Sequence, residues 1–102
     1  MKYSTKVNKC KPFLSRMDQM NDDDRMAFQY NGKQYYVHAY NDYKGERSYS
    51  VWSGYSGMNV SKVGLTSLSL YTYDMMAQKT TYRIDILKCS IVEGTDDVMK
   101  SA

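Results

Sequence analysis

The strongest structural signal in this sequence is the dipeptide Asn31-Gly32, which lies between two β-prone segments. Asn-Gly favours a two-residue type I′ turn, because both central residues of that turn need positive φ angles. The flanking residues 25–30 and 33–40 are rich in aromatic side chains, which favour strands. Together these features predict an antiparallel β-hairpin.

Residue alternation predicts which face of this hairpin is buried. A two-residue turn fixes the register, so Phe28 is expected opposite Tyr35 and Met26 opposite Val37. The face with the greater apolar content is expected to cover the core. Its members are Met26, Phe28, Tyr30, Tyr35, Val37 and Ala39. The opposite face carries Ala27, Gln29, Gln34, Tyr36, His38 and Tyr40.

Further β-prone segments follow the hairpin and are separated by turn-forming residues. They are expected at residues 47–53, 58–63, 65–73 and 80–92. In the last segment the alternation slips at residues 87–89, where a β-bulge is expected to restore it. The chain therefore predicts an α+β, mainly β domain with a five- or six-stranded curved antiparallel sheet or a small open barrel.

The N-terminal region predicts one short helix. Residues 12–20 carry apolar side chains at the spacing of one helical face, and Pro12 suits the first turn of a helix. Residues 1–11 are expected as a basic, flexible segment, and residues 94–102 as a frayed C-terminal tail. The aspartates of residues 22–24 are expected in a solvated turn. The length of 102 residues fits a single domain, residues 1–102.

Catalytic and metal-binding motifs are scarce. His38 is the only histidine, and catalysis would need a second positioned group that the sequence does not identify. The aspartates of residues 22–24 lack the spaced ligands of a calcium loop. We therefore expect neither enzymatic activity nor a cofactor or metal. Cys10 and Cys89 are expected as two reduced thiols, the alternative being a bridge that ties the two ends of the chain together.

Composition indicates where the protein is located and which kinds of partner it binds. No apolar run approaches the about 18 residues that cross a bilayer, and the N-terminal residues lack the apolar stretch of a signal peptide. We therefore expect no membrane association and a cytoplasmic location. The net charge of +3 and the pI near 8.8 exclude an acidic mimic of nucleic acid. Both values are slightly lower than is usual for a domain that binds nucleic acid through its phosphates, whose pI is typically above about 9.

Tyrosine is over-represented, with eleven copies in the chain. A half-buried sheet explains some of them, because tyrosine has a high β-propensity. Others fall on polar faces or in turns, which indicates a binding surface. The candidate surface comprises Tyr36, His38, Tyr40, Tyr43, Arg47, Trp52 and Tyr55.

Three functions fit these features. The first is a non-enzymatic protein that binds a larger host protein or complex, because Tyr, Trp, Met and Arg are enriched at interface centres. The compositional bias favours a phage- or mobile-element-encoded inhibitor of a host enzyme or defence complex, similar in style to anti-CRISPR proteins. The alternative is a single-stranded nucleic-acid-binding module, in which the rings of Tyr36, Tyr40 and Trp52 stack on bases. The phosphates would be contacted by Lys33, Lys44, Arg47 and the basic N-terminal segment. The third is a structural or virion component that assembles through exposed strand edges.

Overall fold

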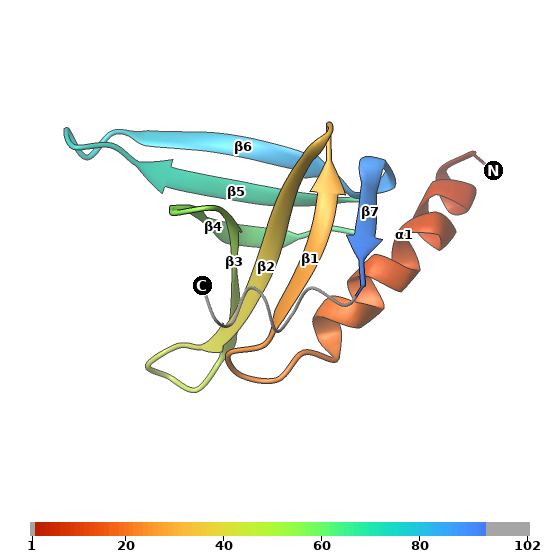
Figure 1. The fold of residues 1–102 in the computed structure, drawn as a ribbon, viewed down its shortest axis with the longest axis horizontal. Coiled ribbons are helices and arrows are strands. Elements are labelled where there is room, and N and C mark those ends of the chain that lie inside the picture. The colour runs from red at the N-terminus through yellow and green to blue at the C-terminus, as the bar shows by residue number, and fades with distance from the viewer. Residues whose placement is uncertain (1, 94–102) are drawn as a thin grey trace.

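The computed structural model describes residues 2–93, which form one α-helix and seven antiparallel strands in a curled sheet (Figure 1). The elements in chain order are α1 (Lys2–Asp18), β1 (Arg25–Tyr30), β2 (Lys33–Asn41), β3 (Arg47–Ser53), β4 (Ser56–Val63), β5 (Ser67–Tyr73), β6 (Lys79–Asp85), the 3-10 helix η1 (Ile86–Lys88) and β7 (Cys89–Val92). The strand order across the sheet is β6-β5-β4-β3-β2-β1-β7. The predicted α+β, mainly β class is confirmed, although the sheet has more strands than the five or six expected.

The β1–β2 hairpin has the predicted register. Phe28 lies opposite Tyr35. The turn residues Asn31 and Gly32 have φ angles of 53° and 74°, as a type I′ turn requires. Ala27 departs from the expected pattern, because it lies on the polar face and is nevertheless fully buried. It sits on β1, which has strands paired to both of its sides.

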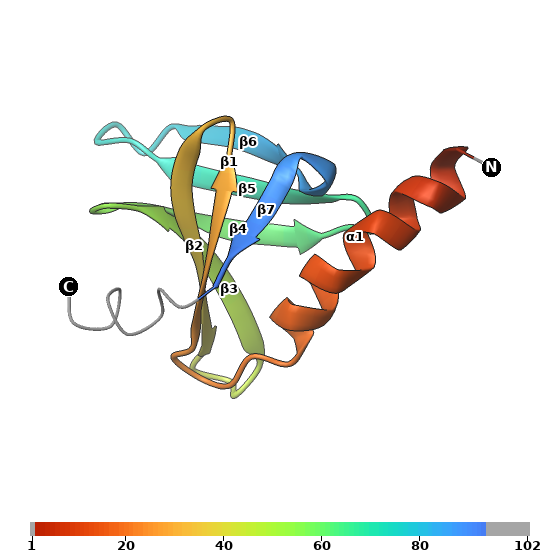
Figure 2. The same cartoon turned by 45° about the vertical axis from the view of Figure 1, so that its right-hand side comes forward.

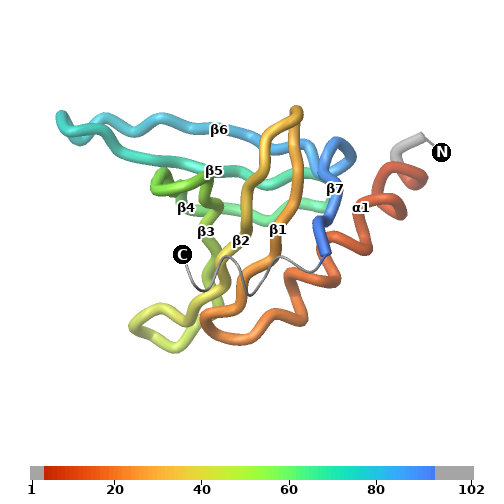
Figure 3. Tube along the Cα trace, viewed as in Figure 1, coloured from red at the N-terminus to blue at the C-terminus, as the bar shows by residue number. Residues whose placement is uncertain are grey.

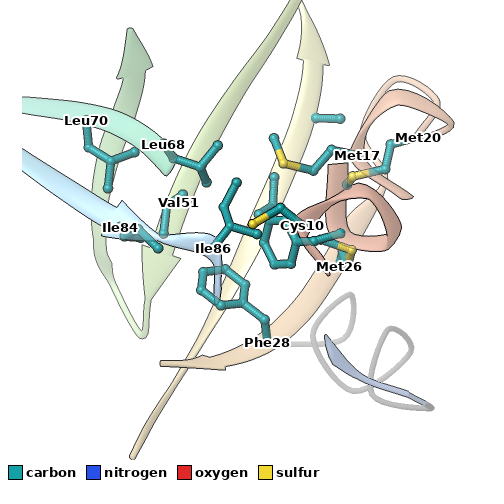
Figure 4. Packing of buried hydrophobic residues seen from close by; sticks show 13 residues of the cluster. Cys10, Met17, Met20, Met26, Phe28, Val51, Leu68, Leu70, Ile84 and Ile86 are labelled. Carbon is teal, nitrogen blue, oxygen red and sulfur yellow. The ribbon is translucent and has the colours of Figure 1, made fainter. Parts of the chain in front are cut away.

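The inner face of the curled sheet and α1 enclose one hydrophobic core (Figure 4). The predicted core face of the hairpin is confirmed at its centre, where Phe28 and Val37 have no exposed surface. The rings of Phe13 on α1 and Phe28 on β1 are nearly perpendicular and pack edge to face, with their centroids 5.3 Å apart. The other buried apolar residues are Cys10, Met17, Met20, Met26, Ala27, Ala39, Val51, Leu68, Leu70, Ile84 and Ile86.

The last predicted strand, residues 80–92, divides into two strands at opposite edges of the sheet. β6 ends at Asp85, whose carboxylate accepts a hydrogen bond from the Leu87 N–H at 3.1 Å and caps η1. The chain turns there, and β7 pairs with β1 instead of continuing beside β5 (Figure 2). The slip in alternation at residues 87–89 was therefore interpreted wrongly as a bulge. It marks the 3-10 turn that carries the chain across to β1.

The helix is longer than predicted. It begins at Lys2, so Pro12 lies inside α1 rather than in its first turn, and the segment expected to be flexible is helical from residue 2. The core contacts of α1 begin at Cys10, whereas residues 4–9 are exposed or half-buried. Figure 3 shows the N-terminal turns of α1 and the tip of the β5–β6 hairpin on opposite sides of the molecule. The predicted tail, residues 94–102, lies outside the described residues.

The aspartates between α1 and β1 order this connection. The carboxylate of Asp22 accepts a hydrogen bond from the Asn41 N–H at 2.8 Å. The carboxylate of Asp24 accepts one from the Asn21 N–H at 2.7 Å. Asp23 has a φ angle of 70°, in the left-handed region that aspartate tolerates. The acidic run is therefore a structured turn, which its own carboxylates hold against β2.

Candidate protein-binding surface

Four of the seven predicted surface residues lie together on the outer face of the sheet. Tyr36, His38 and Tyr40 alternate along β2, and Trp52 lies opposite Tyr36 on β3. Each of the four is half-buried. Their neighbours of opposite parity on β2, such as Val37, are buried in the core. The alternation read from the sequence therefore brings these four side chains to one surface.

The same face continues across β4 to two further tyrosines. His38 pairs with Ser50 of β3, Ser50 with Asn59 of β4, and Asn59 with Tyr71 of β5. Tyr73 lies two residues further along β5 and shares this face. The rings of Tyr71 and Tyr73 meet edge to face at a centroid distance of 5.7 Å. We define the outer aromatic stripe as Tyr36, His38, Tyr40, Trp52, Tyr71 and Tyr73.

Two contacts fix the indole of Trp52. Its Nε1–H donates a hydrogen bond to the Ser50 Oγ at 2.8 Å. A Cβ atom added to Gly57 would lie 2.7 Å from three carbon atoms of the indole, so the ring lies directly against the Gly57 backbone. Gly57 belongs to β4, the strand between β3 and β5. The indole thus covers the strand that separates the two groups of tyrosines.

His38 is held by the ordered acidic turn. Its Nε2 lies 2.7 Å from the Asp23 Oδ1, and a guanidinium nitrogen of Arg25 lies 3.7 Å from the same oxygen. Its ring tilts by 31° against the ring of Tyr40, with centroids 5.8 Å apart. Contacts with this carboxylate and with the Tyr40 ring therefore hold His38 in its place on the surface.

The other three predicted residues lie away from the outer aromatic stripe. Tyr43 and Tyr55 are 93% and 100% exposed, in the turns at opposite ends of β3. Arg47 pairs with Asn41, on the face opposite to that of Tyr40. Its guanidinium donates hydrogen bonds to the main-chain carbonyl just after α1 and to the Asn41 side chain. The structure therefore gives Arg47 an anchoring role at the end of the helix and does not bring it to the candidate surface.

The β5–β6 hairpin contributes groups that the candidate surface omitted. Met75 and Met76 are 102% and 80% exposed at its tip, and Tyr73 is 57% exposed beside them. The Lys79 Nζ lies 4.8 Å from the centroid of the Tyr71 ring, in a cation–π contact. The sequence feature that could have indicated this part of the surface is a pair of methionines in a polar turn next to alternating tyrosines. It could not be connected to β2 and β3 because the strand order was not predicted.

The thiols are poor candidates for chemistry. Cys10 and Cys89 are both free, so the structure does not contain the bridge considered as an alternative. Burial raises the pKa of the Cys10 thiol, and burial together with the Asp85 carboxylate raises the pKa of Cys89 to about 12. The thiolate is the reactive form of cysteine, so both side chains are neutral and unreactive near neutral pH. Across residues 2–93, no three His, Cys, Asp or Glu side chains gather as metal ligands would.

Comparisons with protein-family models, with curated proteins and with solved structures find no match for this chain. No helical stretch among residues 2–93 combines the length and the apolar character that crossing a bilayer requires.

Proposed function

We propose that this protein acts by binding another protein through the outer aromatic stripe. The observation that carries the proposal is that ring-bearing side chains from β2, β3 and β5 meet on one face of the sheet. Tyrosine and tryptophan supply large contact areas at low entropic cost and are enriched at the centres of interfaces. Met75 and Met76, exposed in the turn that follows Tyr73, add flexible apolar groups of the kind that adapt to a partner.

The outer aromatic stripe is preorganised for binding. Ser50 and Gly57 fix the indole of Trp52, and Asp23 orients His38. Lys79 and Tyr73 flank the ring of Tyr71. Side chains that are already ordered lose little freedom on association, so more of the contact energy contributes to affinity. This order supports a recognition surface rather than a scatter of exposed aromatic side chains.

Inhibition of a host enzyme or defence complex stays a prediction within this proposal. A small rigid domain inhibits a larger protein by occupying a surface which that protein needs, and the outer aromatic stripe would be the occupying face. Its partner would then present a complementary apolar patch with a polar rim.

A capture experiment with two matched double variants tests the proposal. The stripe variant carries Tyr71→Ser and Tyr73→Ser, and the control variant carries Tyr43→Ser and Tyr55→Ser in the turns. Wild-type protein and both variants are immobilised in lysate of the natural host, and bound proteins are quantified by mass spectrometry. We expect one protein to be retained by wild type and control and lost from the stripe variant. Retention by both folded variants, or loss from both, would contradict the proposal.

Single-stranded nucleic acid is the second candidate ligand, and one observation favours it. Lys79 lies over the ring of Tyr71, and Lys62 and Arg83 both lie opposite Ser69, on the outer face. Aromatic rings interleaved with cations form the stacking platform that unpaired bases need.

The basic residues first considered for that role lie elsewhere. Lys33 and Lys44 lie over the rings of Tyr35 and Tyr43, away from the outer aromatic stripe, and Arg47 anchors the end of α1. A titration of labelled single-stranded oligonucleotide at low and moderate salt tests this candidate. Binding that weakens as salt rises would support it, because phosphate contacts release counterions. Absence of binding at low salt would eliminate it.

A further inference from the structure

β6 forms one edge of the sheet, and within residues 2–93 no strand pairs with its outer side (Figures 1 and 2). Residues 79–83 are all exposed, and Tyr82 retains 48% of its surface. The pairing of β6 with β5 runs over seven residues without a register shift, and β6 contains no proline. A long regular edge of this kind presents open backbone donors and acceptors to another strand.

Backbone alternation shows which residues of β6 face the open side. The Ile86 N–H donates to the Thr66 carbonyl, so even-numbered residues direct their backbone groups toward β5. Odd-numbered residues therefore direct their N–H and C=O groups outward. These residues are Lys79, Thr81, Arg83 and Asp85, and of their outward carbonyls that of Asp85 accepts the Cys89 thiol at 3.6 Å.

We propose that two copies of this chain pair antiparallel along β6, with the two-fold axis at Tyr82. In this register Lys79 lies opposite Asp85 of the partner subunit, and Thr81 opposite Arg83 of the partner subunit. Both pairs join outward-facing residues, so the Thr81–Arg83 pair exchanges two backbone hydrogen bonds. In the Lys79–Asp85 pair the Asp85 N–H is open to the partner, whereas the Asp85 carbonyl also accepts the Cys89 thiol of its own chain at 3.6 Å. Tyr82 meets its own copy at the axis, where aromatic side chains stabilise a cross-strand pair. The interface is self-complementary, as a closed dimer requires.

Charge selects this register over its neighbours. An axis at Thr81 would place Lys79 opposite Arg83, and an axis at Arg83 would place two arginines opposite each other. Like charges directly opposite one another destabilise a strand pair. The axis at Tyr82 instead places a lysine opposite an aspartate on both sides of the axis, and it pairs all seven residues of β6.

Dimerisation along β6 would duplicate the outer aromatic stripe. A two-fold axis between antiparallel edge strands passes through the sheet from one face to the other, so both outer faces lie on the same side. Two copies of the surface then point in one direction, which raises avidity for a partner with repeated sites. The self-pairing itself does not depend on the proposed function.

Disulfide trapping tests the register. Tyr82→Cys places two thiols opposite each other at a non-hydrogen-bonded pair, where the Cα atoms lie about 4.5 Å apart and a disulfide can close. The control, Thr80→Cys, lies on the same face of β6, but its two copies are about 13 Å apart along the strands. Mild oxidation is expected to link Tyr82→Cys into dimers and to leave Thr80→Cys unlinked. Equal linking of both variants, or of neither, would overturn the proposal.

Charge reversal tests the pairing in solution by sedimentation velocity. Lys79→Glu and Asp85→Lys each place like charges opposite one another twice and are expected to weaken dimerisation about tenfold. An equal mixture of the two variants restores dimers, because both charge pairs of the heterodimer are complementary. Failure of the mixture to dimerise, or a wild type that is monomeric at millimolar concentration, would overturn the proposal.

A third variant covers the case in which Asp85→Lys does not fold, since Asp85 also caps η1. Thr81→Pro removes an outward N–H without touching the pairing with β5, and Thr81→Ala keeps that donor. We expect the proline variant to be monomeric and the alanine variant to dimerise as wild type does. Equal dimerisation of the two variants would contradict the β6 interface.

Discussion

At the scale of single residues, the pair Trp52 and Gly57 shows how the outer face is built. Glycine weakens a strand, because it contributes no side chain and loses much conformational entropy on folding. At position 57 this loss is offset by the close approach of the indole, whose ring carbons would lie 2.7 Å from any Cβ. The glycine therefore sets the orientation of a surface aromatic.

Gly57→Ala is expected to displace the indole. The added methyl overlaps the ring, so we expect the free energy of unfolding to fall by about 1–3 kcal/mol, as overpacking usually costs. Trp52 is the only tryptophan, so its fluorescence emission should shift to the red. In a Trp52→Ala background the same substitution should lower the free energy of unfolding by less, because the indole that clashes with the added methyl is absent. Equal costs in the two backgrounds would show that the contact is not as described.

The thiol of Cys89 makes stability depend on pH in the alkaline range. Burial raises its pKa from 9.0 to about 12, so the folded state holds this proton more tightly than the unfolded state. The resulting stability is complete below pH 9.0 and is lost as pH rises toward about 12. Denaturant midpoints should therefore fall above pH 9.0 more steeply for wild type than for Cys89→Ala. Identical pH profiles would contradict the assigned burial.

At the scale of elements, side chains from β3 hold the end of α1. Arg47 donates to the Met20 carbonyl, and the Tyr49 hydroxyl donates to the Met17 carbonyl at 3.1 Å. The Met17 carbonyl also accepts the Met20 N–H at 3.2 Å, and Met20 lies just beyond α1, so these donors secure the last turn of the helix and the residues that leave it. The exposed arginine that looked like a binding residue thus supports the fold.

Arg47→Ala is expected to lower the free energy of unfolding by about 1–2 kcal/mol, because a charge-assisted hydrogen bond to a carbonyl is lost. The same variant should retain its partner in the capture experiment, which separates support of the fold from recognition. Loss of the partner in a variant of wild-type stability would instead place Arg47 at the interface.

Pro12 interrupts the hydrogen bonding of α1. A proline inside a helix removes one backbone donor and crowds the preceding turn, at a cost of about 3 kcal/mol. Because Pro12 is exposed within α1, Pro12→Ala should raise the melting temperature without disturbing the core. Lys11→Ala, at the neighbouring exposed position, serves as the control and should leave it nearly unchanged. A lower melting temperature for Pro12→Ala would mean that the proline supports this helix.

At the scale of the whole molecule, local signals predicted most of the elements but not their assembly. The register of the hairpin follows from Asn31-Gly32, and the predicted bounds 47–53 match β3, because turn chemistry and alternation act within a few residues. The crossing of β7 to β1 depends on the Asp85 cap and on the direction in which η1 leaves β6, and sequence periodicity contains neither.

For the candidate surface, too, the sequence predicted which residues of one strand share a face but not which strands lie side by side. Alternation on β2 and β3 identified Tyr36, His38, Tyr40 and Trp52, whereas joining them to β5 required the strand order. Arg47 lies apart from these residues, on the opposite face of the sheet, where it contacts the carbonyl of Met20. Its acceptor, a carbonyl distant in sequence, appears only in the folded chain.

The curled sheet therefore has two faces of different composition. Its inner face is filled by its own side chains and by α1, and its outer face presents the outer aromatic stripe. If that face recognises a protein, side chains on it contact the partner, whereas equally accessible side chains in the turns do not.

Site-specific photo-crosslinking directly tests whether the outer face contacts the partner. A photoreactive phenylalanine analogue replaces either Tyr73, which is 57% exposed on the outer aromatic stripe, or Tyr43, which is 93% exposed in the β2–β3 turn. Illumination in the natural host is predicted to yield a covalent adduct from position 73, with the same protein that the capture experiment retains, and none from position 43. An adduct from position 43 alone, or equal adducts from both positions, would contradict binding through the outer face.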